Sequence, residues 1–372
     1  MKKTTLLILI SFSAAATYAQ VYSNKVVGKK NATTIDSLKK SVYPYVLPIW
    51  GEKATKRGFN LPYSAGLGIN YLWQKSDLVI DNLQVGLNNG PLHDLSEVVR
   101  FDNATSEAQG INFRPDIWLF PFLNIYGILA KSKPSTAIDA GVYVQGDDGV
   151  WTQVMELNTK ANFEATSMGF GITPTIGVGG GWMALDMNFT WNDIAELEDP
   201  AFAFIFGPRF GKSFKLKKPD SNIALWVGGF RLKLNTGTSG SIDLTELFDM
   251  EGLQTKVDNG IIAVDQKYQE VDAWWNSLTP PQQALPGNKA RHEAAIRALD
   301  AAGGFLNSMD EALNDEQNAS VQYSLDKRPK DMWNFVLGTQ YQYSKHWMLR
   351  LECGFLGSRQ QVIAGLQYRF GL

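Results

Sequence analysis

The chain has 372 residues, of which 44% are hydrophobic and 12% aromatic, so it is long enough to form a sizeable folded body. Its 35 basic and 37 acidic residues nearly cancel, which argues against nucleic acid as a partner. The only cysteine, Cys353, excludes an internal disulfide as a source of stability.

The first residues have the layout of a secretory signal peptide. Two lysines precede an apolar run from Leu6 to Phe12, and small residues lead to Ala19. The apolar run has about half of the ~20 residues that a membrane-spanning helix needs, which argues against an anchor. We therefore predict a signal peptide over residues 1–19 and export of the remaining chain to the periplasm, the outer membrane or the medium.

Residues 20–60 lack the alternation of a strand. A polar stretch around Asp36 is followed by YPYVLPIW, whose prolines favour extended backbone. We expect a periplasmic N-terminal arm that can enter the mouth of a following barrel.

From about residue 61, many segments of roughly ten residues alternate between apolar and polar residues. In SAGLGINYLWQ, Leu67, Ile69 and Tyr71 share one face, while glycines and polar residues share the other. AFAFIFGPRFG and KDMWNFVLGTQYQYS repeat this division, with aromatic residues along the apolar face. Strands with an apolar outer face and a polar inner face are the signature of a transmembrane β-barrel.

We predict an all-β fold, a transmembrane antiparallel up-and-down β-barrel of about 12 strands with both termini in the periplasm. The predicted strands cover 61–74, 78–88, 107–119, 122–131, 135–146, 164–178, 181–192, 200–213, 221–235, 330–344, 346–356 and 360–372. Residues 89–106, which include Leu92, Leu95 and Val98, are expected to form a short periplasmic helix.

A long insert separates the ninth and tenth predicted strands. Residues 236–329 change from a period of two to a helical period. The two helical stripes are Ile261, Val264, Tyr268, Val271, Trp275 and Leu278, then Ile296, Leu299, Ala302, Leu306, Met309 and Leu313. Between them, Thr279 and Gln282 resemble a capping box with proline in the first turn. This extracellular hairpin could be a lid, an inward plug, a docking surface or a passive cap whose stripes bury each other.

The last predicted strand keeps its alternation to the final residue. Lipid offers no hydrogen-bond partners, so the sheet must close, and the last strand must pair with the first. Tyr368, Phe370 and Leu372 also resemble the C-terminal signal of outer-membrane barrel assembly, with leucine in place of the usual last phenylalanine. Outer-membrane lipid and the barrel assembly machinery are therefore the expected partners.

Four stretches are similar to those of a largely uncharacterised family of Gram-negative outer-membrane β-barrel proteins. They are FRPDIWLFPFLNIYGI, LDMNFTWNDI, MWNFVLGTQYQYSKHWMLRLECGFLGSRQ and AGLQYRFGL. The resemblance covers most of the chain from about residue 60, including the insert with its SLTPPQQ phrase. It implies a barrel in the outer membrane, and it implies no reaction and no substrate.

The residues give little support for catalysis, metal binding or a cofactor. The three histidines, His93, His292 and His346, lie in no recognisable motif with a serine or aspartate nucleophile. No paired His/Cys spacing or EF-hand pattern indicates a metal site. GVGGGW at 177–182 lacks the lysine and helix of a phosphate-binding loop, so it is interpreted as a turn.

Function is therefore expected in the lumen. Ten charged residues are predicted to point inward, because a charge on the lipid face would cost a few kcal/mol. They are Arg114, Asp116, Asp139, Asp186, Arg209, Arg231, Lys233, Arg350, Glu352 and Arg369. They either line a porin-like passage for a small solute of unknown identity, narrowed by the insert and the arm, or pair with one another and fill the interior. In the second case the barrel would be structural or binding, with the extracellular hairpin as its partner or adhesion surface.

Overall fold

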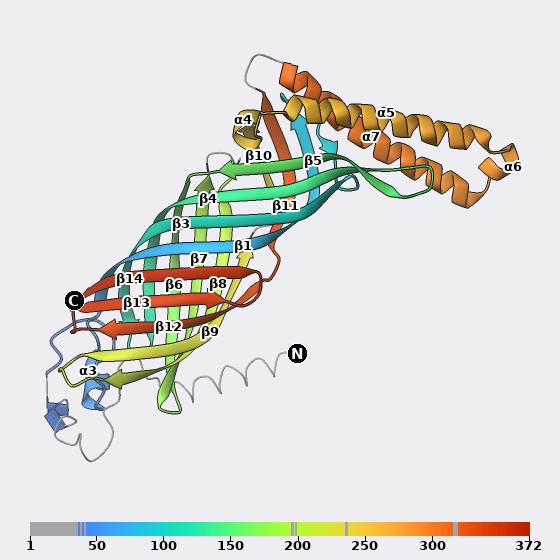
Figure 1. The fold of residues 1–372 in the computed structure, drawn as a ribbon. Coiled ribbons are helices and arrows are strands. Elements are labelled where there is room, and N and C mark those ends of the chain that lie inside the picture. The colour runs from blue at the N-terminus through green and yellow to red at the C-terminus, as the bar shows by residue number, and fades with distance from the viewer. Residues whose placement is uncertain are drawn as a thin grey trace.

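The computed structural model describes residues 36–37, 39–40, 42–194, 197, 199–234, 237–314 and 319–372. The predicted signal peptide and the first part of the predicted arm lie outside these residues. The described chain forms a closed β-barrel, a sheet that continues beyond one end of it, and a helical hairpin packed on that sheet (Figure 1).

Ten antiparallel strands close the barrel, because β1 pairs with β14 along one edge and with β3 along the other. In order around the wall they are β1 (Ala65–Leu87), β14 (Arg359–Phe370), β13 (Trp347–Phe355), β12 (Trp333–Gln342), β9 (Asn222–Leu234), β8 (Ala201–Lys215), β7 (Gly181–Ile194), β6 (Ala165–Val178), β4 (Leu123–Gln145) and β3 (Val99–Phe120). The prediction of an all-β, closed antiparallel barrel is confirmed.

The two ends of the barrel differ. The terminal end holds the start of β1, the end of β14 and the links at 121–122, 179–180, 216–221 and 343–346. At the other end, β1, β3 and β4 continue beyond the barrel and form what we call the extension (Figure 1). Four outer strands complete the extension: β2 (His93–Asp94), β5 (Trp151–Asn162), β10 (Gly237–Asp243) and β11 (Ser320–Pro329).

The predicted count of about 12 barrel strands is wrong by two. Residues 61–74 and 78–88 were predicted as two strands, but both fall largely in the single strand β1. Where a turn was expected, β1 changes its partner instead, pairing with β14 up to Ser76 and with β11 from Leu78 onward. In the same way, β4 covers the two strands predicted before and after residue 133.

Pro134 marks the change of partner in β4. The strand pairs with β6 up to Ser132 and with β5 from Ser135 onward. The carbonyl oxygen of Pro134 accepts a hydrogen bond of 2.8 Å from the N–H of Phe163, which lies in the link between β5 and β6. In an antiparallel ladder, the N–H and C=O of one residue point to the same neighbouring strand. The N–H that proline lacks would therefore face this link, so Pro134 does not end the strand.

The segment between β10 and β11 is helical, with α4 (Leu244–Leu247), α5 (Leu253–Ser277), α6 (Pro280–Gln283) and α7 (Pro286–Asn314). Val264 and Val271 of α5 and Leu299 and Leu306 of α7 are almost completely buried, in one core that also contains residues of β4 and β5. The predicted stripes thus pack against each other and against the extension. Among the described residues, none of the helices is both long and apolar enough to cross a membrane.

The turn between the two long helices is the predicted capping box. The N–H of Thr279 donates to Oε1 of Gln282 at 2.9 Å, and prolines occupy the first two positions of α6. Proline suits these positions because their N–H groups have no partner within the helix.

The helix expected in residues 89–106 is not formed. The N–H groups of Val98 and Val99 bond to the carbonyl of Leu95, which makes a single turn, and β3 begins at Val99. Leu95 and Val98 instead enter the core beneath the helical hairpin. The apolar spacing therefore marks contact with a helix, and this segment lies at the extension end of the barrel.

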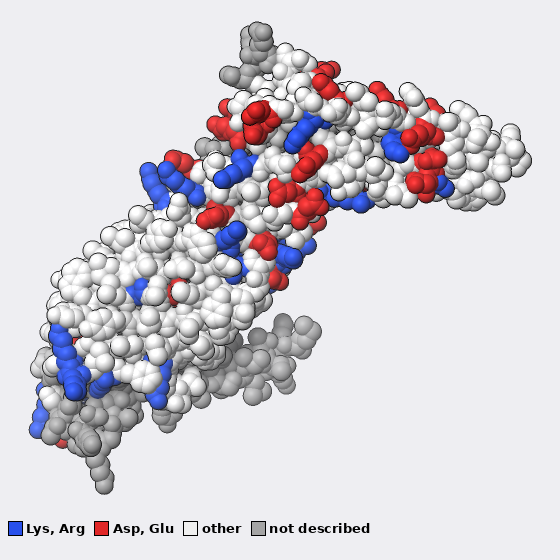
Figure 2. Space-filling model, viewed as in Figure 1, with Lys and Arg blue, Asp and Glu red and all other residues white. Residues whose placement is uncertain are grey.

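The outside of the barrel is apolar, while charges gather on the extension, on the helices and near the terminal end (Figure 2). Exposed apolar and aromatic side chains occur on each barrel strand, for example Leu67, Ile69, Phe113, Leu129, Phe170, Trp191, Phe210, Val227, Leu337, Leu349 and Tyr368. Water does not favour so much exposed apolar surface on a soluble protein. This surface is what a strand facing lipid carries.

Candidate functional site

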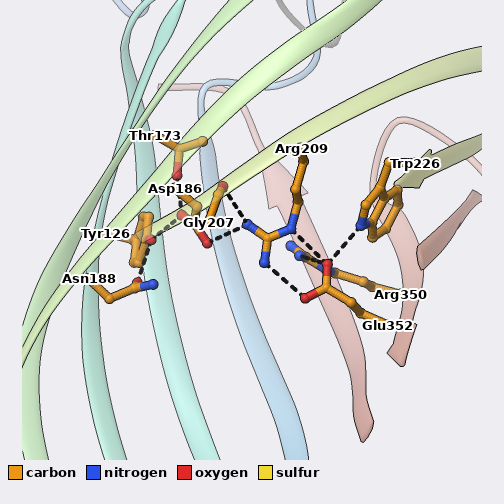
Figure 3. A network of polar contacts seen from close by, with 9 residues as sticks. All are labelled: Tyr126, Thr173, Asp186, Asn188, Gly207, Arg209, Trp226, Arg350 and Glu352. Atoms are coloured by element: carbon orange, nitrogen blue, oxygen red, sulfur yellow. Dashed lines mark hydrogen bonds and ion pairs between the residues drawn. The ribbon is translucent and has the colours of Figure 1, made fainter. Parts of the chain in front are cut away.

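The barrel interior contains an ion-pair network, which we call the lumen network: Asp186 of β7, Arg209 of β8 and Glu352 of β13 (Figure 3). Nη1 of Arg209 lies 3.0 Å from Oδ2 of Asp186. Nε and Nη2 of Arg209 donate to the two oxygens of Glu352 at 2.7 and 2.9 Å. The planar guanidinium matches the carboxylate in this two-pronged arrangement. The Arg209 side chain is 7% exposed and that of Glu352 is 0% exposed, so water is almost excluded.

Each carboxylate has further hydrogen-bond donors. The hydroxyls of Tyr126 and Thr173 both donate to Oδ1 of Asp186 at 2.5 Å. The indole N–H of Trp226 donates to Oε2 of Glu352 at 2.7 Å. Buried charges are costly unless their hydrogen bonds are satisfied, and these donors provide that satisfaction.

The lumen network crosses the barrel instead of following its wall. Strands β8 and β13 are separated by β9 and β12, which places them about 14 Å apart along the wall at ~4.8 Å per step. Arg209 and Glu352 meet across this gap, and Arg350 adds a contact of 3.1 Å to Glu352. Side chains therefore fill the section of the lumen at this level.

A second cluster lies nearer the terminal end. Nη2 of Arg369 lies 3.0 Å from Oδ1 of Asp116, joining β14 to β3 across β1. Asn124 donates to Oδ1 of Asp116 at 2.8 Å, and Gln367 also donates to this carboxylate. Nε of Arg369 donates to the carbonyl of Tyr63 at 3.0 Å, which connects the cluster to the chain before β1.

A polar cavity of about 90 Å³ separates the two clusters. Arg114 lines it, with its guanidinium carbon 3.4 Å from the centre of the Tyr126 ring. Arg350 and Gln340 line the same space. The structure thus brings seven of the ten predicted inward charges into one connected region of the lumen, namely Arg114, Asp116, Asp186, Arg209, Arg350, Glu352 and Arg369.

The other three predicted residues lie elsewhere. Asp139 is exposed on the extension, where its carboxylate accepts a hydrogen bond of 3.3 Å from Asn103. Arg231 and Lys233 are exposed on β9, in the same alternation as Leu225 and Val227.

Sequence reasoning missed several interior residues at the extension end of the barrel. Arg359 and Gln361 of β14 are 0% and 1% exposed, and Asn334 of β12 is 4% exposed. The guanidinium of Arg359 donates to the carbonyl of Asp331 at 3.4 Å and lies over the ring of Phe230. For Asn334 the available signal was its place between Trp333 and Phe335, whereas the neighbours of Arg359, Ser358 and Gln360, are polar and gave no such signal.

The segment from 42 to 63 lies at the terminal end. The N–H of Leu47 donates to the carbonyl of Leu372 at 3.2 Å, and the N–H of Ile49 donates to the carbonyl of Leu119 at 2.9 Å. These bonds attach the segment to the ends of β14 and β3. It also contains the short helix α3 (Gly51–Lys56).

Aromatic contacts hold the same segment against the rim. The ring centre of Trp50 lies 5.0 Å from that of Phe120 and 6.3 Å from that of Phe122. The hydroxyl of Tyr43 donates to the carbonyl of Leu47 at 2.7 Å, and burial raises the pKa of Tyr43 to about 12. The phenol therefore remains a hydrogen-bond donor at neutral pH.

The three histidines lie far from one another. His93 contacts Ser308 of α7 at 3.2 Å, His292 stacks on Trp275, and His346 contacts the carbonyl of Arg369 at 2.8 Å. Within the described part of the chain, no group of three or more His, Cys, Asp or Glu side chains is placed to hold a metal ion.

Gly338 of β12 provides the space that Trp226 occupies in the lumen. A Cβ at this position would lie 2.1 Å from the Trp226 ring, so Gly338→Ala must displace the indole that donates to Glu352. We expect Gly338→Ala to lower the free energy of unfolding by about 1–3 kcal/mol, the usual cost of overpacking. Urea unfolding in lipid vesicles would measure it, with Gly287→Ala, where a Cβ meets open space, as control. Equal urea midpoints of unfolding for Gly338→Ala and the unchanged protein would contradict the prediction.

No family model and no curated protein matches the sequence. Among solved structures, the β domain of the Bordetella autotransporter BrkA is similar with 9% identity and a TM-score of 0.30, over 82% of this chain and 100% of that one. An outer membrane channel from Pseudomonas putida is similar with 8% identity and a TM-score of 0.28, over 84% of this chain and 97% of that one. The translocator domain of the autotransporter NalP from Neisseria meningitidis has 8% identity and a TM-score of 0.31, over 82% of this chain and 89% of that one. TM-scores this low give no basis for transferring a function.

Proposed function

We propose that this protein is an outer-membrane channel for small polar solutes. Its passage is narrowed by the lumen network and by the N-terminal segment, and the helical insert covers its other end. The observation that carries the proposal is a barrel interior lined by charged and amide side chains, which retains a polar cavity of about 90 Å³. A barrel filled only for stability would be better served by apolar side chains, because buried ion pairs seldom add net stability.

The apolar exterior supports a location in the membrane. Exposed leucine, phenylalanine and tryptophan side chains surround the ten-strand barrel, and the charged extension lies outside this surface (Figure 2). Barrels of this class have short periplasmic turns and longer extracellular loops. The terminal end is therefore assigned to the periplasm and the extension to the cell exterior, and Tyr368, Phe370 and Leu372 are proposed as the assembly signal.

Single-channel conductance in a planar bilayer tests the proposal. The refolded protein should pass little current, because the lumen network fills the section of the barrel. Replacing Asp186, Arg209 and Glu352 together by alanine removes these side chains, and Arg350, which then loses its carboxylate partner, is 24% exposed and becomes hydrated in the widened lumen, so conductance should rise. The control is the double variant of the exposed Arg231 and Lys233 to alanine, which should conduct like the unchanged protein.

The alternative function is a binding or structural barrel with a permanently filled lumen, and the many buried hydrogen bonds of the network favour it. A silent triple-alanine variant that retains the mobility of a folded barrel on an unheated gel would support this alternative. A silent variant that also lacks residues 20–60 and the helices α4 to α7 would exclude the channel, since neither the two proposed constrictions nor the cover would remain.

A further inference from the structure

The extension contains a partly open apolar cavity of about 160 Å³, lined by other residues than the lumen network. Strands β1, β3, β4, β5 and β11 contribute to its wall, together with α7. The lining is almost entirely aliphatic and aromatic, and includes Phe101, Ile138, Leu157 and Met309. Apolar surface that remains in contact with water is unfavourable, so an apolar cavity of this size is suited to an apolar ligand.

Two β-bulges keep apolar side chains on the cavity side. The register of β1 shifts between Asp81 and Gln84, where Asn82 has a φ of 53°. Leu83 and Val85 therefore line the cavity together with Ile80, although strict alternation would turn them outward. A shift after Phe101 in β3 acts in the same way. The two strands thus depart from regular geometry at the point where they line the apolar cavity.

Lys327 is the only charged side chain among the described residues that line this cavity. It lies opposite Ile80 in the register of β11 and β1. The charges beside it in sequence belong to other pairs: Asp326 accepts from Asn82, and Arg328 lies 3.6 Å from Asp81. Burial lowers the pKa of Lys327, and no carboxylate in the described part of the chain opposes this effect. A lysine in an apolar wall without an acidic partner is costly unless an anion meets it.

We propose that this cavity binds a small free carboxylic acid with an apolar body, whose carboxylate pairs with the ammonium of Lys327. The volume is comparable to that of an engineered apolar cavity of roughly 150 Å³ that holds benzene. One aromatic ring or a short branched chain therefore fits, and the two acyl chains of a phospholipid do not. Binding at this site does not require that the barrel conducts.

Fluorine NMR of the full mature chain in nanodiscs of zwitterionic lipid tests the proposal. The probes are para-(trifluoromethyl)benzoate and its uncharged amide, which differ only in the group that would meet Lys327. The benzoate should bind about tenfold more tightly than the amide, because a hydrogen bond to a charged group adds about that factor. Lys327→Met keeps the apolar stem and should remove this difference. Arg328→Met, on the exposed face of the same strand, should leave it unchanged.

A second variant tests the place of binding. Ala140 and Ala161 line the cavity, so Ala140→Leu with Ala161→Leu should fill it and weaken both probes. Three results would overturn the proposal: no binding of the benzoate, equal binding of the two probes to the unchanged protein, or unchanged benzoate binding in Lys327→Met. Displacement of the probe by phosphatidylglycerol in the nanodisc would also overturn the assignment to a free acid, since a lipid would then be the occupant.

Discussion

Arg209→Met is expected to lower the free energy of unfolding of the barrel by about 3–5 kcal/mol, the typical cost of removing one partner from a buried ion pair. Arg209 contacts Asp186 and Glu352 at once, with a shortest distance of 2.7 Å to Glu352. The substitution leaves two buried carboxylates without their shared cation. Urea unfolding in lipid vesicles, followed by tryptophan fluorescence, would measure the loss.

The control for this effect is a neutral version of the same network. Asp186→Asn and Glu352→Gln, combined with Arg209→Met, keep the side-chain volumes and remove all three charges. This triple variant should recover most of the lost stability, because the main cost in the single variant comes from uncompensated charge. Arg231→Met, at an exposed position of β9, should have little effect. If Arg209→Met were as stable as the original protein, the prediction would be wrong, because the ion pairs of the lumen network would then make no net contribution to the free energy of unfolding.

Strand alternation was sufficient to predict the barrel, because a lipid-facing strand must show it in every segment. It could not fix the number of strands. The lengths of β1 and β4 depend on which strand pairs with each half, and β11, the partner of the second half of β1, follows only after the helical insert in the sequence. A polar KSD stretch and Pro134 look like turns in the sequence, yet each marks a change of pairing partner within a continuous strand.

At Arg231 and Lys233, two rules of sequence interpretation disagree: charged residues are expected to face the lumen, and strand alternation places these two residues on the outer face. Arg231 and Lys233 were predicted to face the lumen because they are charged, although they share one alternation with the apolar residues Leu225 and Val227. In the structure β9 keeps one alternation, and both charges are exposed beyond these apolar residues. Applied consistently, alternation would also have placed Trp226 inside, where it donates to Glu352. The contacts between strands distant in sequence had no signal in a single chain.

The helical insert was predictable as two amphipathic stripes, whereas its partners were not. Helical spacing shows that a face is buried, and it does not show against which surface. The core joins α5 and α7 to apolar residues of β4, β5 and the turn at 95–98. Two bulges in the extension also displace the alternation there, so the apolar cavity could not be read from strand patterns.

The second large effect is expected in this helical core. Leu306→Ala should destabilise the helical hairpin and the extension by about 2–5 kcal/mol, because Leu306 is 0% exposed and packs beside Gly260 of α5. The ten barrel strands close without any contribution from the helices, so the barrel itself should retain its stability. Hydrogen exchange followed by mass spectrometry should show faster exchange in α5 and α7 and unchanged exchange in β6 to β9.

The matched control is Ile262→Ala, since Ile262 is 55% exposed on α5 and its truncation leaves no buried cavity. Faster hydrogen exchange throughout the barrel in Leu306→Ala would contradict the prediction that the barrel keeps its stability. It would mean that the extension and the barrel unfold as one cooperative unit. If the effect stays within the hairpin, the insert can open while the lumen network remains intact. The cover that we propose for the insert would need this independence, because its motion must not unfold the wall to which it is attached.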